Sequence, residues 1–450
     1  MSPAPLLAFY GDDFTGSTDA MEALALSGLR TVLFLSTPTP ELLAARFADV
    51  RCVGVAGTSR AMSPAEMDTD LRPALHALWA LGAPVLHYKV CSTFDSSPTI
   101  GNIGHVVDVA RRELNDGATV PVLAGAPPLR RFTIFGNHFA AAGDEIHRLD
   151  RHPTMSRHPT TPMHEADLRA HLAGQTGATV SLMNLLDLDG ADADVEARFQ
   201  AKMQERPGML LYDVLDDARL RMAGRLIWQQ AQRHRQFVVG SSGVGYALTA
   251  HWRATGTIAQ ARASMPPIAP VKQLLVMSGS ASPMTAQQIA WAAEHGFDTL
   301  RAPAEDLVSA DRVEAARRAL LDRALASLRA GNSVLIYTAA GPEDASIAAT
   351  RARLGEGGNT ARTLGTEMGR LTRELLLQSG LRRVVIAGGD TSSYATQELG
   401  LYALEMQSEL TPGAPLCRGY SNDPRFDGLE IALKGGQMGK ADYFGRVRGA

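Results

Sequence analysis

The sequence predicts an α/β fold of two domains, each with a largely parallel sheet flanked by helices, and three observations carry this prediction. Short apolar runs that are typical of buried strands alternate with longer segments of helical period. The 450 residues are too many for one compact core. The composition, 45% hydrophobic and 20% charged, is that of an ordinary globular protein.

The first half of the chain opens with a strand candidate at residues 6–10, LLAFY. It ends in Gly-Asp-Asp-Phe-Thr-Gly, after which Met21, Leu24 and Ala25 recur at helical spacing until Gly28, a residue suited to a helix C-cap. Residues 140–167, rich in His, Pro, Thr and Met, have no clear period, and we expect a long loop there. The further strand candidates in this half are residues 31–35, 52–56, 85–90, 120–124, 179–183, 209–213 and 237–240.

A domain boundary is predicted near the middle of the chain. Residues 255–273 read TGTIAQARASMPPIAPVKQ, poor in period and rich in proline near the end. We therefore place an N-terminal domain at 1–255, a linker at 256–272 and a C-terminal domain at 273–450. The predicted elements of the second domain are strands at 274–277, 333–337, 383–387 and 429–433 and helices at 285–295, 312–329 and 360–378.

The charge and the cysteine content exclude several classes of function. A net charge of −3 with interspersed signs provides no broad basic face for nucleic acid and no polybasic stretch for a membrane surface. Cys52, Cys91 and Cys417 lie far apart without CxxC spacing, which argues against a disulfide framework or a zinc site and fits a reducing compartment. The N-terminus lacks the basic segment of a signal peptide and no apolar run is long enough to span a bilayer, so we expect a cytoplasmic protein.

The first candidate site is the segment 11–19, GDDFTGSTD, which follows the opening strand. In an open α/β sheet the carboxyl end of a strand faces the ligand crevice, where Asp12 and Asp13 can accept hydrogen bonds from vicinal hydroxyls of a polyol. The alternative is that Asp13 or Thr15 simply caps the following helix. Adjacent aspartates do not supply the D-x-D pattern of a haloacid dehalogenase-type phosphatase.

The second candidate site is the segment 88–97, YKVCSTFDSS, followed by glycines before the next helix. Lys89, hydroxyl groups and the backbone N–H groups of this turn offer a cation and donors to a carboxylate or phosphate. Cys91 has no patterned histidine or base beside it, so we interpret it as a buried small residue and not as a nucleophile. Single polar residues also follow other strands, at Arg60 and in Gly136-Asn137-His138. Taken alone, a residue of this kind is more often a packing or solvated residue than a site residue.

Three turns rich in glycine and serine form the third candidate site. Ser278-Gly279-Ser280 and Gly388-Gly389-Asp390-Thr391-Ser392 each follow a strand and precede a helix, and Gly435-Gly436 follows the last strand. Small residues let the backbone approach phosphate oxygens, hydroxyls add donors, and a helix N-terminus adds partial positive charge. Residues 435–440 read GGQMGK, one residue short of P-loop spacing, and the glycines of 240–245 stand in the order G-x-x-G-x-G, which disfavours a dinucleotide site.

Two of these segments, GDDFTGSTDA and AGGDTSSYATQELG, resemble the two signatures of the four-carbon acid sugar kinase family. The resemblance continues essentially end to end, in order, through YKVCSTFDSSPTIGNIG, IFGNHFA, HPTTPMHEADL, VMSGSAS and LKGGQMG. The K-x-C-S-T-F-D-S form is similar to the 3-oxo-tetronate kinase branch. The chain departs from the common pattern at Cys91, at residues 98–100, where an arginine often stands, and at Asp390, where the usual Glu has a longer reach.

The resemblance implies an N-terminal domain that binds a sugar acid, a C-terminal domain that binds ATP with Mg²⁺, and an active site in the interdomain cleft. The γ-phosphoryl group would pass to a terminal hydroxyl of the acid, with no protein ligand assigned to the metal. An α/β sugar kinase is often dimeric, so a homodimer is one candidate, but the sequence leaves the oligomeric state open. The implied catalytic residues are Asp12 and Asp13, the substrate-binding residues are Thr15, Arg60, Lys89, Ser92, Asp95, Gly136 and His138, and the ATP-binding residues are Ser278, Ser280, Gly388, Gly389, Asp390, Thr391, Ser392, Gly435 and Gly436.

The sequence leaves the substrate open among 3-oxo-tetronate, threonate or erythronate, and branched acids such as 3-oxo-isoapionate. Two other classes of protein stay as alternatives. A dinucleotide-dependent sugar-acid oxidoreductase is disfavoured by the order of the glycines. A non-catalytic sugar-acid sensor requires a DNA-binding or signalling module, and the sequence contains no helix-turn-helix segment or basic arm.

Overall fold

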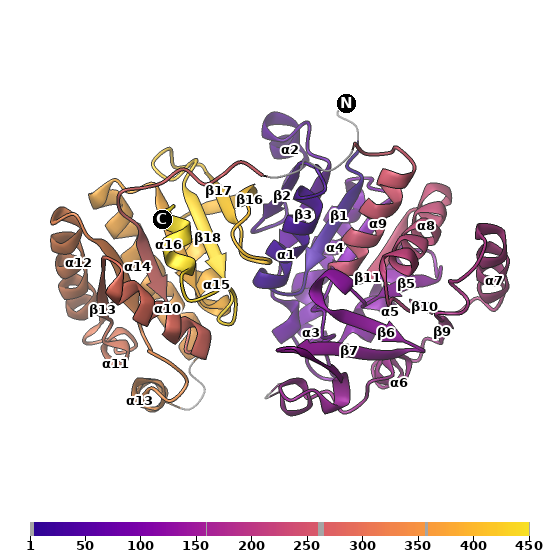
Figure 1. The fold of residues 1–450 in the computed structure, drawn as a ribbon, viewed down its shortest axis with the longest axis horizontal. Coiled ribbons are helices and arrows are strands. Elements are labelled where there is room, and N and C mark those ends of the chain that lie inside the picture. The colour runs from indigo at the N-terminus through magenta and orange to yellow at the C-terminus, as the bar shows by residue number, and fades with distance from the viewer. Residues whose placement is uncertain (1–3, 159, 260–264, 356–358, 450) are drawn as a thin grey trace. The chain divides into compact units, whose positions relative to one another are not determined.

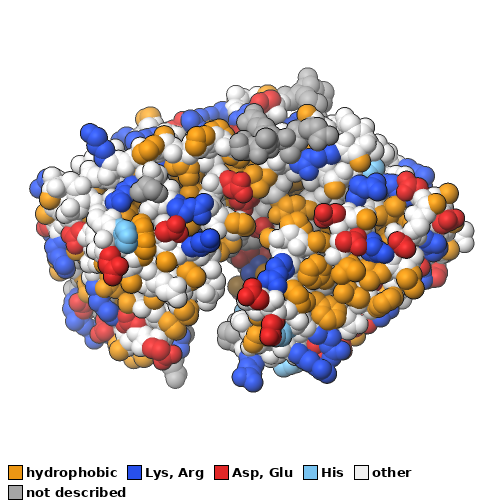
Figure 2. All heavy atoms as spheres, in the orientation of Figure 1, with side chains coloured by type: hydrophobic (Ala, Val, Ile, Leu, Met, Phe, Trp, Pro, Cys, Tyr) orange, Lys and Arg blue, Asp and Glu red, His pale blue; other side chains and the backbone are white. Residues whose placement is uncertain are grey.

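The structure is a computed structural model that describes residues 4–158, 160–259, 265–355 and 359–449, without the side chain of Asp390. The chain divides into two compact units, Met1–Arg262 and Ala263–Ala450 (Figure 1). Within these described ranges, no helix has the length and apolar character needed to cross a membrane. Figure 2 shows acidic and basic side chains intermixed over the face that it presents.

The first unit is built on a parallel sheet with the strand order β2-β3-β1-β4-β11-β5-β10-β9. β1 is buried at every position, as expected for a strand covered by helices on both faces. The strands of this sheet are β1 (Leu7–Gly11), β2 (Thr31–Phe34), β3 (Cys52–Ala56), β4 (Val85–Lys89), β5 (Val120–Leu123), β9 (Val180–Met183), β10 (Met209–Tyr212) and β11 (Gln236–Gly240).

Helices cover both faces of this sheet. The right-handed rule for parallel connections places α1 and α8 on one face and α4 and α5 on the other. Figure 1 shows α1, α9 and α8 side by side, and α9 packs against both neighbours. The helices of the first unit are α1 (Phe14–Ala25), α2 (Pro40–Arg46), α3 (Pro64–Glu66), α4 (Arg72–Ala80), α5 (Ile103–Glu113), α6 (Leu168–Ala173), α7 (Asp192–Gln204), α8 (Asp217–Arg233) and α9 (Gly243–Ala254).

The chain changes direction across the first sheet at β1. After β1 it builds β2 and β3 on one side, and it then crosses to β4 on the other side. Such a topological switch point opens a crevice outside the carboxyl ends of the two strands. The register aligns Gly11 with Ala56 of β3 and with Lys89 of β4, so the residues that follow these strands meet at one place.

A separate antiparallel sheet, with the order β6-β7-β8, follows β5. Its strands are β6 (Arg131–Ile134), β7 (Asn137–Ala142) and β8 (Glu145–Arg148). The prediction of a loop over residues 140–167 is therefore wrong for its first part, which completes β7 and adds β8. The irregularly spaced apolar residues of this segment give no period but bury one another in a small cluster of Ala140, Leu149, Met155, Met163 and Ala166.

The second unit has a sheet with the order β13-β14-β12-β15-β18-β17-β16. The strands from β13 to β18 in this order are parallel, whereas β17 runs antiparallel to both β18 and β16. The sequence analysis did not predict β13, β16 and β17. The strands are β12 (Leu275–Ser278), β13 (Phe297–Arg301), β14 (Ser333–Tyr337), β15 (Arg383–Ala387), β16 (Leu401–Ser408), β17 (Leu416–Ser421) and β18 (Glu430–Lys434).

The second unit has its own switch point, at β12. From β12 the chain builds β13 and β14 on one side and then crosses to β15 on the other, so Gly279 and Gly388 follow neighbouring strands. Apolar residues of this sheet pack against α10 and α16 in one core. The helices of the second unit are α10 (Pro283–Glu294), α11 (Ala304–Leu307), α12 (Val313–Arg329), α13 (Ala345–Leu354), α14 (Thr360–Ser379), α15 (Gly389–Glu398) and α16 (Tyr443–Arg448).

Candidate active site

Three charged residues meet at the switch point of the first unit. Asp12 and Asp13 follow β1, and Arg60 follows β3. The Arg60 guanidinium donates to Asp12 twice, from Nε to Oδ2 at 3.1 Å and from Nη2 to Oδ1 at 3.0 Å. Its Nη2 also lies 2.8 Å from Asp13 Oδ1. One arginine thus bridges the two adjacent carboxylates.

The two aspartates differ in what they leave free. Asp12 is 2% exposed, and both of its carboxylate oxygens are bonded to Arg60. The side chain of Asp13 is 28% exposed, and its Oδ2 has no hydrogen-bond partner among the described residues. Burial, opposed by the charge of Arg60, raises the pKa of Asp13 above its ordinary value. Asp13 therefore presents one free oxygen of raised basicity.

Asp13 is also the N-cap of α1. Its Oδ1 accepts a hydrogen bond from the Gly16 N–H at 2.8 Å. The capping interpretation is therefore confirmed, and it leaves Oδ2 of Asp13 without a hydrogen-bond partner among the described residues.

Lys89, at the end of β4, adds a buried cation. The residue is 1% exposed, and its ammonium makes no hydrogen bond within the described part of the chain. A Cβ at Gly16 would lie 2.6 Å from Lys89 Nζ and 2.5 Å from Asp13 Oδ1. A side chain at position 16 would therefore have to displace the ammonium of Lys89 and the carboxylate of Asp13. In the same helical turn, the half-buried Thr15 hydroxyl has no partner among the residues described.

Side-chain hydrogen bonds hold the turn that follows Lys89. Thr93 Oγ1 donates to Asp95 Oδ1 at 2.6 Å, and Cys91 Sγ lies 3.0 Å from Thr93 Oγ1. Asp95 is buried, which favours a role in holding the turn. Burial raises the pKa of Cys91 to about 11. The raised pKa disfavours the thiolate at neutral pH, although Cys91 is half-buried and not fully buried as the sequence analysis expected.

His138 holds the same turn from β7. Its Nε2 donates to the Ser92 carbonyl at 2.8 Å, and its Nδ1 accepts from Thr133 Oγ1 at 3.0 Å. Burial lowers the pKa of His138 to about 4, so the ring is neutral. With both nitrogens engaged, the geometry favours a positioning role for His138 over a direct contact with substrate.

Gly136 belongs to a turn that is tied to Asp213, a residue that the sequence analysis did not select. The Asp213 carboxylate accepts hydrogen bonds from the N–H groups of Phe135 at 2.6 Å, Gly136 at 2.9 Å and Leu185 at 3.2 Å. Phe135 and Gly136 have φ angles of 50° and 84°, which the carboxylate stabilises. Burial nevertheless raises the pKa of Asp213 to about 6. Its place directly after a parallel strand was the sequence signal for it.

Three glycine turns converge at the switch point of the second unit. A Cβ at Gly279 would lie 2.0 Å from Thr391 Oγ1, and one at Gly436 would lie 2.7 Å from Ser280 Oγ. A Cβ at Gly388, whose φ is 120°, would lie 3.2 Å from the Ser280 nitrogen. The absence of side chains at these positions is what lets the turns approach one another.

The converging turns carry donors for an anion. α15 begins at Gly389, so its first backbone N–H groups have no partner within the helix. The Ser278 hydroxyl has no hydrogen-bond partner in the described ranges, but the residue is fully buried and its hydroxyl is not open to a ligand. The Ser280 hydroxyl accepts from Thr285 Oγ1 at 3.0 Å. Free amides and hydroxyls at the start of a helix form a suitable cradle for phosphate.

Lys434, at the end of β18, supports the last of these turns. Its Nζ donates to Thr285 Oγ1 at 3.0 Å and to the Gly436 carbonyl at 3.3 Å. Burial lowers the pKa of Lys434 to about 8. The lysine thus ties the Gly435-Gly436 turn to α10.

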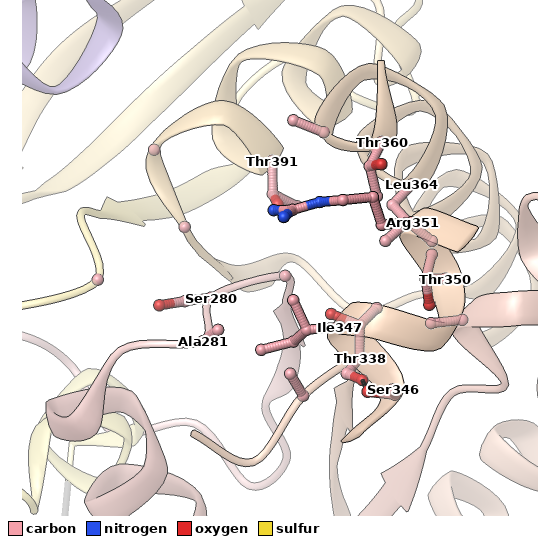
Figure 3. A pocket seen from close by; sticks show the side chains of 17 residues that line it. Ser280, Ala281, Thr338, Ser346, Ile347, Thr350, Arg351, Thr360, Leu364 and Thr391 are labelled. Atoms are coloured by element: carbon pink, nitrogen blue, oxygen red, sulfur yellow. Dashed lines mark hydrogen bonds between the residues drawn. The ribbon is translucent and has the colours of Figure 1, made fainter. Parts of the chain in front are cut away.

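A cavity of about 310 Å³ opens beside the glycine turns. Ser280 and Thr391 line one side, and α13 with the start of α14 lines the other (Figure 3). The α13 and α14 wall combines the apolar Ile347 and Leu364 with a buried Thr350 hydroxyl that has no hydrogen-bond partner among the described residues. The sequence analysis missed this wall because it contains no motif.

Not every predicted site residue faces a site. The Ser392 hydroxyl donates to the Ile386 carbonyl at 3.3 Å, Gly435 does not line the cavity, and the side chain of Asp390 lies outside the described structure. Among the described residues, no group of three or more His, Cys, Asp or Glu side chains is placed to hold a metal ion. The residues that do gather are Asp12, Asp13, Thr15, Arg60 and Lys89 in the first unit and Ser280, Gly388, Gly389, Thr391 and Gly436 in the second, whereas Ser278 is fully buried and does not line the cavity.

These two groups define a class of protein. The first unit offers carboxylates and cations to a small polar molecule, and the second offers a glycine-lined cavity to phosphates. Phosphoryl transfer to a small acceptor needs this pair of sites, since its catalysis is mostly positioning and charge neutralisation. The fold and sites are those of a small-molecule kinase with two α/β domains.

Comparisons with known proteins identify the family. Residues 7–248 match a sugar-binding N-terminal domain, and residues 275–444 match a nucleotide-binding C-terminal domain. The chain is 49% identical to a 3-oxo-isoapionate kinase from Paraburkholderia graminis, over 98% of this chain and 94% of that protein. It is 34% identical to a 3-oxo-tetronate kinase from Methylobacterium radiotolerans, over 98% of each chain. The chain belongs to this family of sugar-acid kinases.

Solved structures share the whole fold. A Salmonella typhimurium protein that bears the name of a tRNA synthase superposes with a TM-score of 0.80 at 25% identity, over 98% of each chain. A Haemophilus influenzae protein, described as a family of unknown function, superposes with a TM-score of 0.73 at 25% identity, over 98% of this chain and 99% of that one. The oxidoreductase and sensor alternatives find no support in the kinase names of the sequence relatives.

Proposed function

We propose that this chain is an ATP-dependent kinase that phosphorylates a terminal hydroxyl of the branched sugar acid 3-oxo-isoapionate. The observation that carries this choice of substrate is the 49% identity to a 3-oxo-isoapionate kinase, against 34% to a 3-oxo-tetronate kinase, over equal shares of this chain. The proposal places the branched acid ahead of 3-oxo-tetronate, which the motif at residues 88–97 put first.

In this proposal the first unit binds the acid at the switch point of its sheet. Lys89 and the free Nη1 of Arg60 bind the substrate carboxylate, and the Thr15 hydroxyl contacts a substrate hydroxyl. Two observations support this assignment. The Lys89 ammonium has no hydrogen-bond or ion-pair partner among the described residues, and the Arg60 guanidinium contacts the aspartates only through Nε and Nη2. Ser92, Asp95, Gly136 and His138 shape the wall of this site through the hydrogen bonds that hold their turns.

We assign the catalytic base to Asp13 and the anchoring of Arg60 to Asp12. Both oxygens of Asp12 are engaged, whereas Asp13 keeps Oδ2 free and is more exposed. A raised pKa suits a group that accepts a proton from the attacking hydroxyl as the phosphoryl group arrives. The interaction of Asp12 with Arg60 keeps the guanidinium beside Asp13, where it offsets the charge of the substrate.

The second unit binds ATP with its phosphates at the glycine turns. The support is that Gly279, Gly388 and Gly436 lie where any Cβ would crowd the neighbouring turn, and that free N–H groups of α15 are directed at this end of the cavity. The base then lies against Ile347 and Leu364, two apolar residues that line the cavity. Mg²⁺ usually binds proteins through few carboxylates plus substrate phosphates, so we propose that it enters with the triphosphate.

Phosphoryl transfer requires the γ-phosphate held by the second unit to meet the hydroxyl held by the first. An active site between the two domains stays a prediction that the family resemblance implies. Cytoplasmic location and a homodimeric state stay predictions.

The test is ADP release by the purified chain with ATP and Mg²⁺, across a panel of four- and five-carbon sugar acids. We expect the highest kcat/KM for 3-oxo-isoapionate, a lower value for 3-oxo-tetronate, and lower values still for threonate and erythronate. Reactions with NAD or NADP and no ATP serve as the control for an oxidoreductase. If none of these acids is turned over with ATP, the proposal is refuted. A preference for 3-oxo-tetronate would refute only the choice of substrate.

A further inference from the structure

The nucleotide cavity of the second unit contains a single charged side chain. Of the residues that line it within the described structure, only Arg351 carries a formal charge, and the others are small, hydroxylic or apolar. A triphosphate brings several negative charges into this space. Backbone N–H groups supply partial positive charge only, so the charge balance of a bound nucleotide depends on Arg351 and on the metal.

Arg351 has no partner of its own. It is exposed, and it makes no hydrogen bond or ion pair with any described residue. Figure 3 shows its side chain extending from α13 across the cavity, toward the side on which Thr391 lies. Arg353, two residues further along α13, behaves differently, since its Nε donates to Ser309 Oγ at 2.7 Å. The two arginines are on different faces of the helix, and only Arg351 is directed at the cavity.

A second cation near the glycine turns, Lys434, already has partners among the described residues. Lys434 is buried, does not line the cavity, and has its Nζ bonded to Thr285 and to the Gly436 carbonyl. It supports the turn from within the unit. A guanidinium that reaches the phosphates from the open side of the cavity must come from α13.

We propose that Arg351 binds the phosphate chain of the nucleotide, opposite the glycine turns, and so makes this cavity specific for phosphorylated adenosine. The inference rests on the proposed function, in which this cavity holds ATP. A planar guanidinium can donate two parallel hydrogen bonds to phosphate oxygens, whereas a lysine at this position would supply only a point charge. Arg351 would thus act as a specificity residue and would hold the phosphates against the amides of α15.

The test measures binding of ATP, ADP and adenosine to the full chain by isothermal titration calorimetry in the presence of Mg²⁺. Arg351→Ala is expected to weaken ATP binding by about 10- to 100-fold, the range for losing charge-assisted hydrogen bonds, and to leave adenosine binding unchanged. Arg351→Lys is expected to recover part of the ATP affinity. The matched control Arg353→Ala removes a cation from the same helix and is expected to leave both affinities unchanged.

The outcomes separate this inference from the proposed function. If the unmodified chain binds ATP and Arg351→Ala binds it equally well, Arg351 does not contact the phosphates, and the proposed function stands. Equal losses of ATP and adenosine would mean that Arg351 only shapes the cavity, which also overturns the inference. If the unmodified chain does not bind ATP, the assignment of the cavity itself is wrong. Equal melting temperatures of all variants are the check that each is folded.

Discussion

Replacing Asp13 by Asn tests the catalytic assignment with little change to the fold. The substitution keeps an oxygen that accepts the Gly16 N–H at the start of α1, and Asn and Asp are about equally good N-caps. It removes the negative charge next to Arg60 and the free Oδ2 that we assign as the proton acceptor. The substitution should therefore change the stability of the fold little and the rate of phosphoryl transfer strongly.

The expected loss of stability follows from the exposure of the two side chains, and the expected loss of turnover follows from the removal of a base. The Asp13 and Arg60 side chains are 28% and 25% exposed, and partly solvated ion pairs contribute only about 0.2–1 kcal/mol to stability. The melting temperature is therefore expected to fall by less than about 4 °C. Loss of a positioned base lowers turnover by about 10²- to 10⁴-fold, equivalent to about 3–5 kcal/mol in the barrier.

The assay is steady-state ADP release with saturating ATP and sugar acid, alongside thermal unfolding. Because the pKa of Asp13 is raised, the unmodified chain is expected to lose kcat/KM on the acidic side at a higher pH than an ordinary carboxylate would cause, and the variant is expected to lack that limb. Asp13→Ala is the control, since it also removes the cap and is expected to cost about 1 kcal/mol more in stability. A variant Asp13→Asn with turnover within about threefold of the original, at the same melting temperature, would remove Asp13 from the mechanism.

Three further predictions concern the nucleotide turns and the Asp213 turn. Gly388→Ala places a Cβ at a φ of 120° and 3.2 Å from the Ser280 nitrogen, so ATP binding measured by calorimetry is expected to weaken about tenfold or more, and unchanged affinity would contradict the close packing of the turns. Because burial lowers the pKa of Lys434 to about 8, its charge is lost as the pH rises through that value. ATP affinity is therefore expected to fall over this pH range in the unmodified chain but not in Lys434→Met. Parallel pH profiles of the two chains would show that the charge of Lys434 does not affect ATP binding. Asp213→Asn turns an acceptor of three backbone N–H groups partly into a donor, so chemical denaturation is expected to show a loss of about 1–3 kcal/mol, whereas an unchanged midpoint would mean that solvent replaces these bonds.

Local sequence signals predicted most of the parallel strands because buried strands of an α/β sheet are short apolar runs bounded by turn residues. β16 and β17 do not have this pattern and were not predicted. Both are antiparallel strands in which polar residues such as Glu405 and Arg418 interrupt the apolar positions. In the small sheet, the strand that precedes Gly136 was expected and is β6, whereas β7 and β8 were not predicted, since they are half exposed and bury only a minor cluster.

The site residues that the sequence identified are those that directly follow parallel strands. Topology brings such residues together, as it brings Arg60 to Asp12 across the sheet. The roles within the cluster were not predictable, because they depend on side-chain geometry. The sequence does not show that Asp13 keeps Oδ2 free or that Arg60 donates two hydrogen bonds to Asp12. Arg351 and Thr350 could not be selected either, since they lie on an ordinary helix whose contact with the glycine turns is set only by the tertiary fold.

A crystal structure of the chain with ADP, Mg²⁺ and 3-oxo-isoapionate bound tests the central claim most directly. We predict that the diphosphate lies on the turns of Gly279, Gly388 and Gly436, that the carboxylate of the acid contacts Lys89, and that its terminal hydroxyl faces Asp13. Density for the nucleotide or the acid at any other place in the chain would contradict the account.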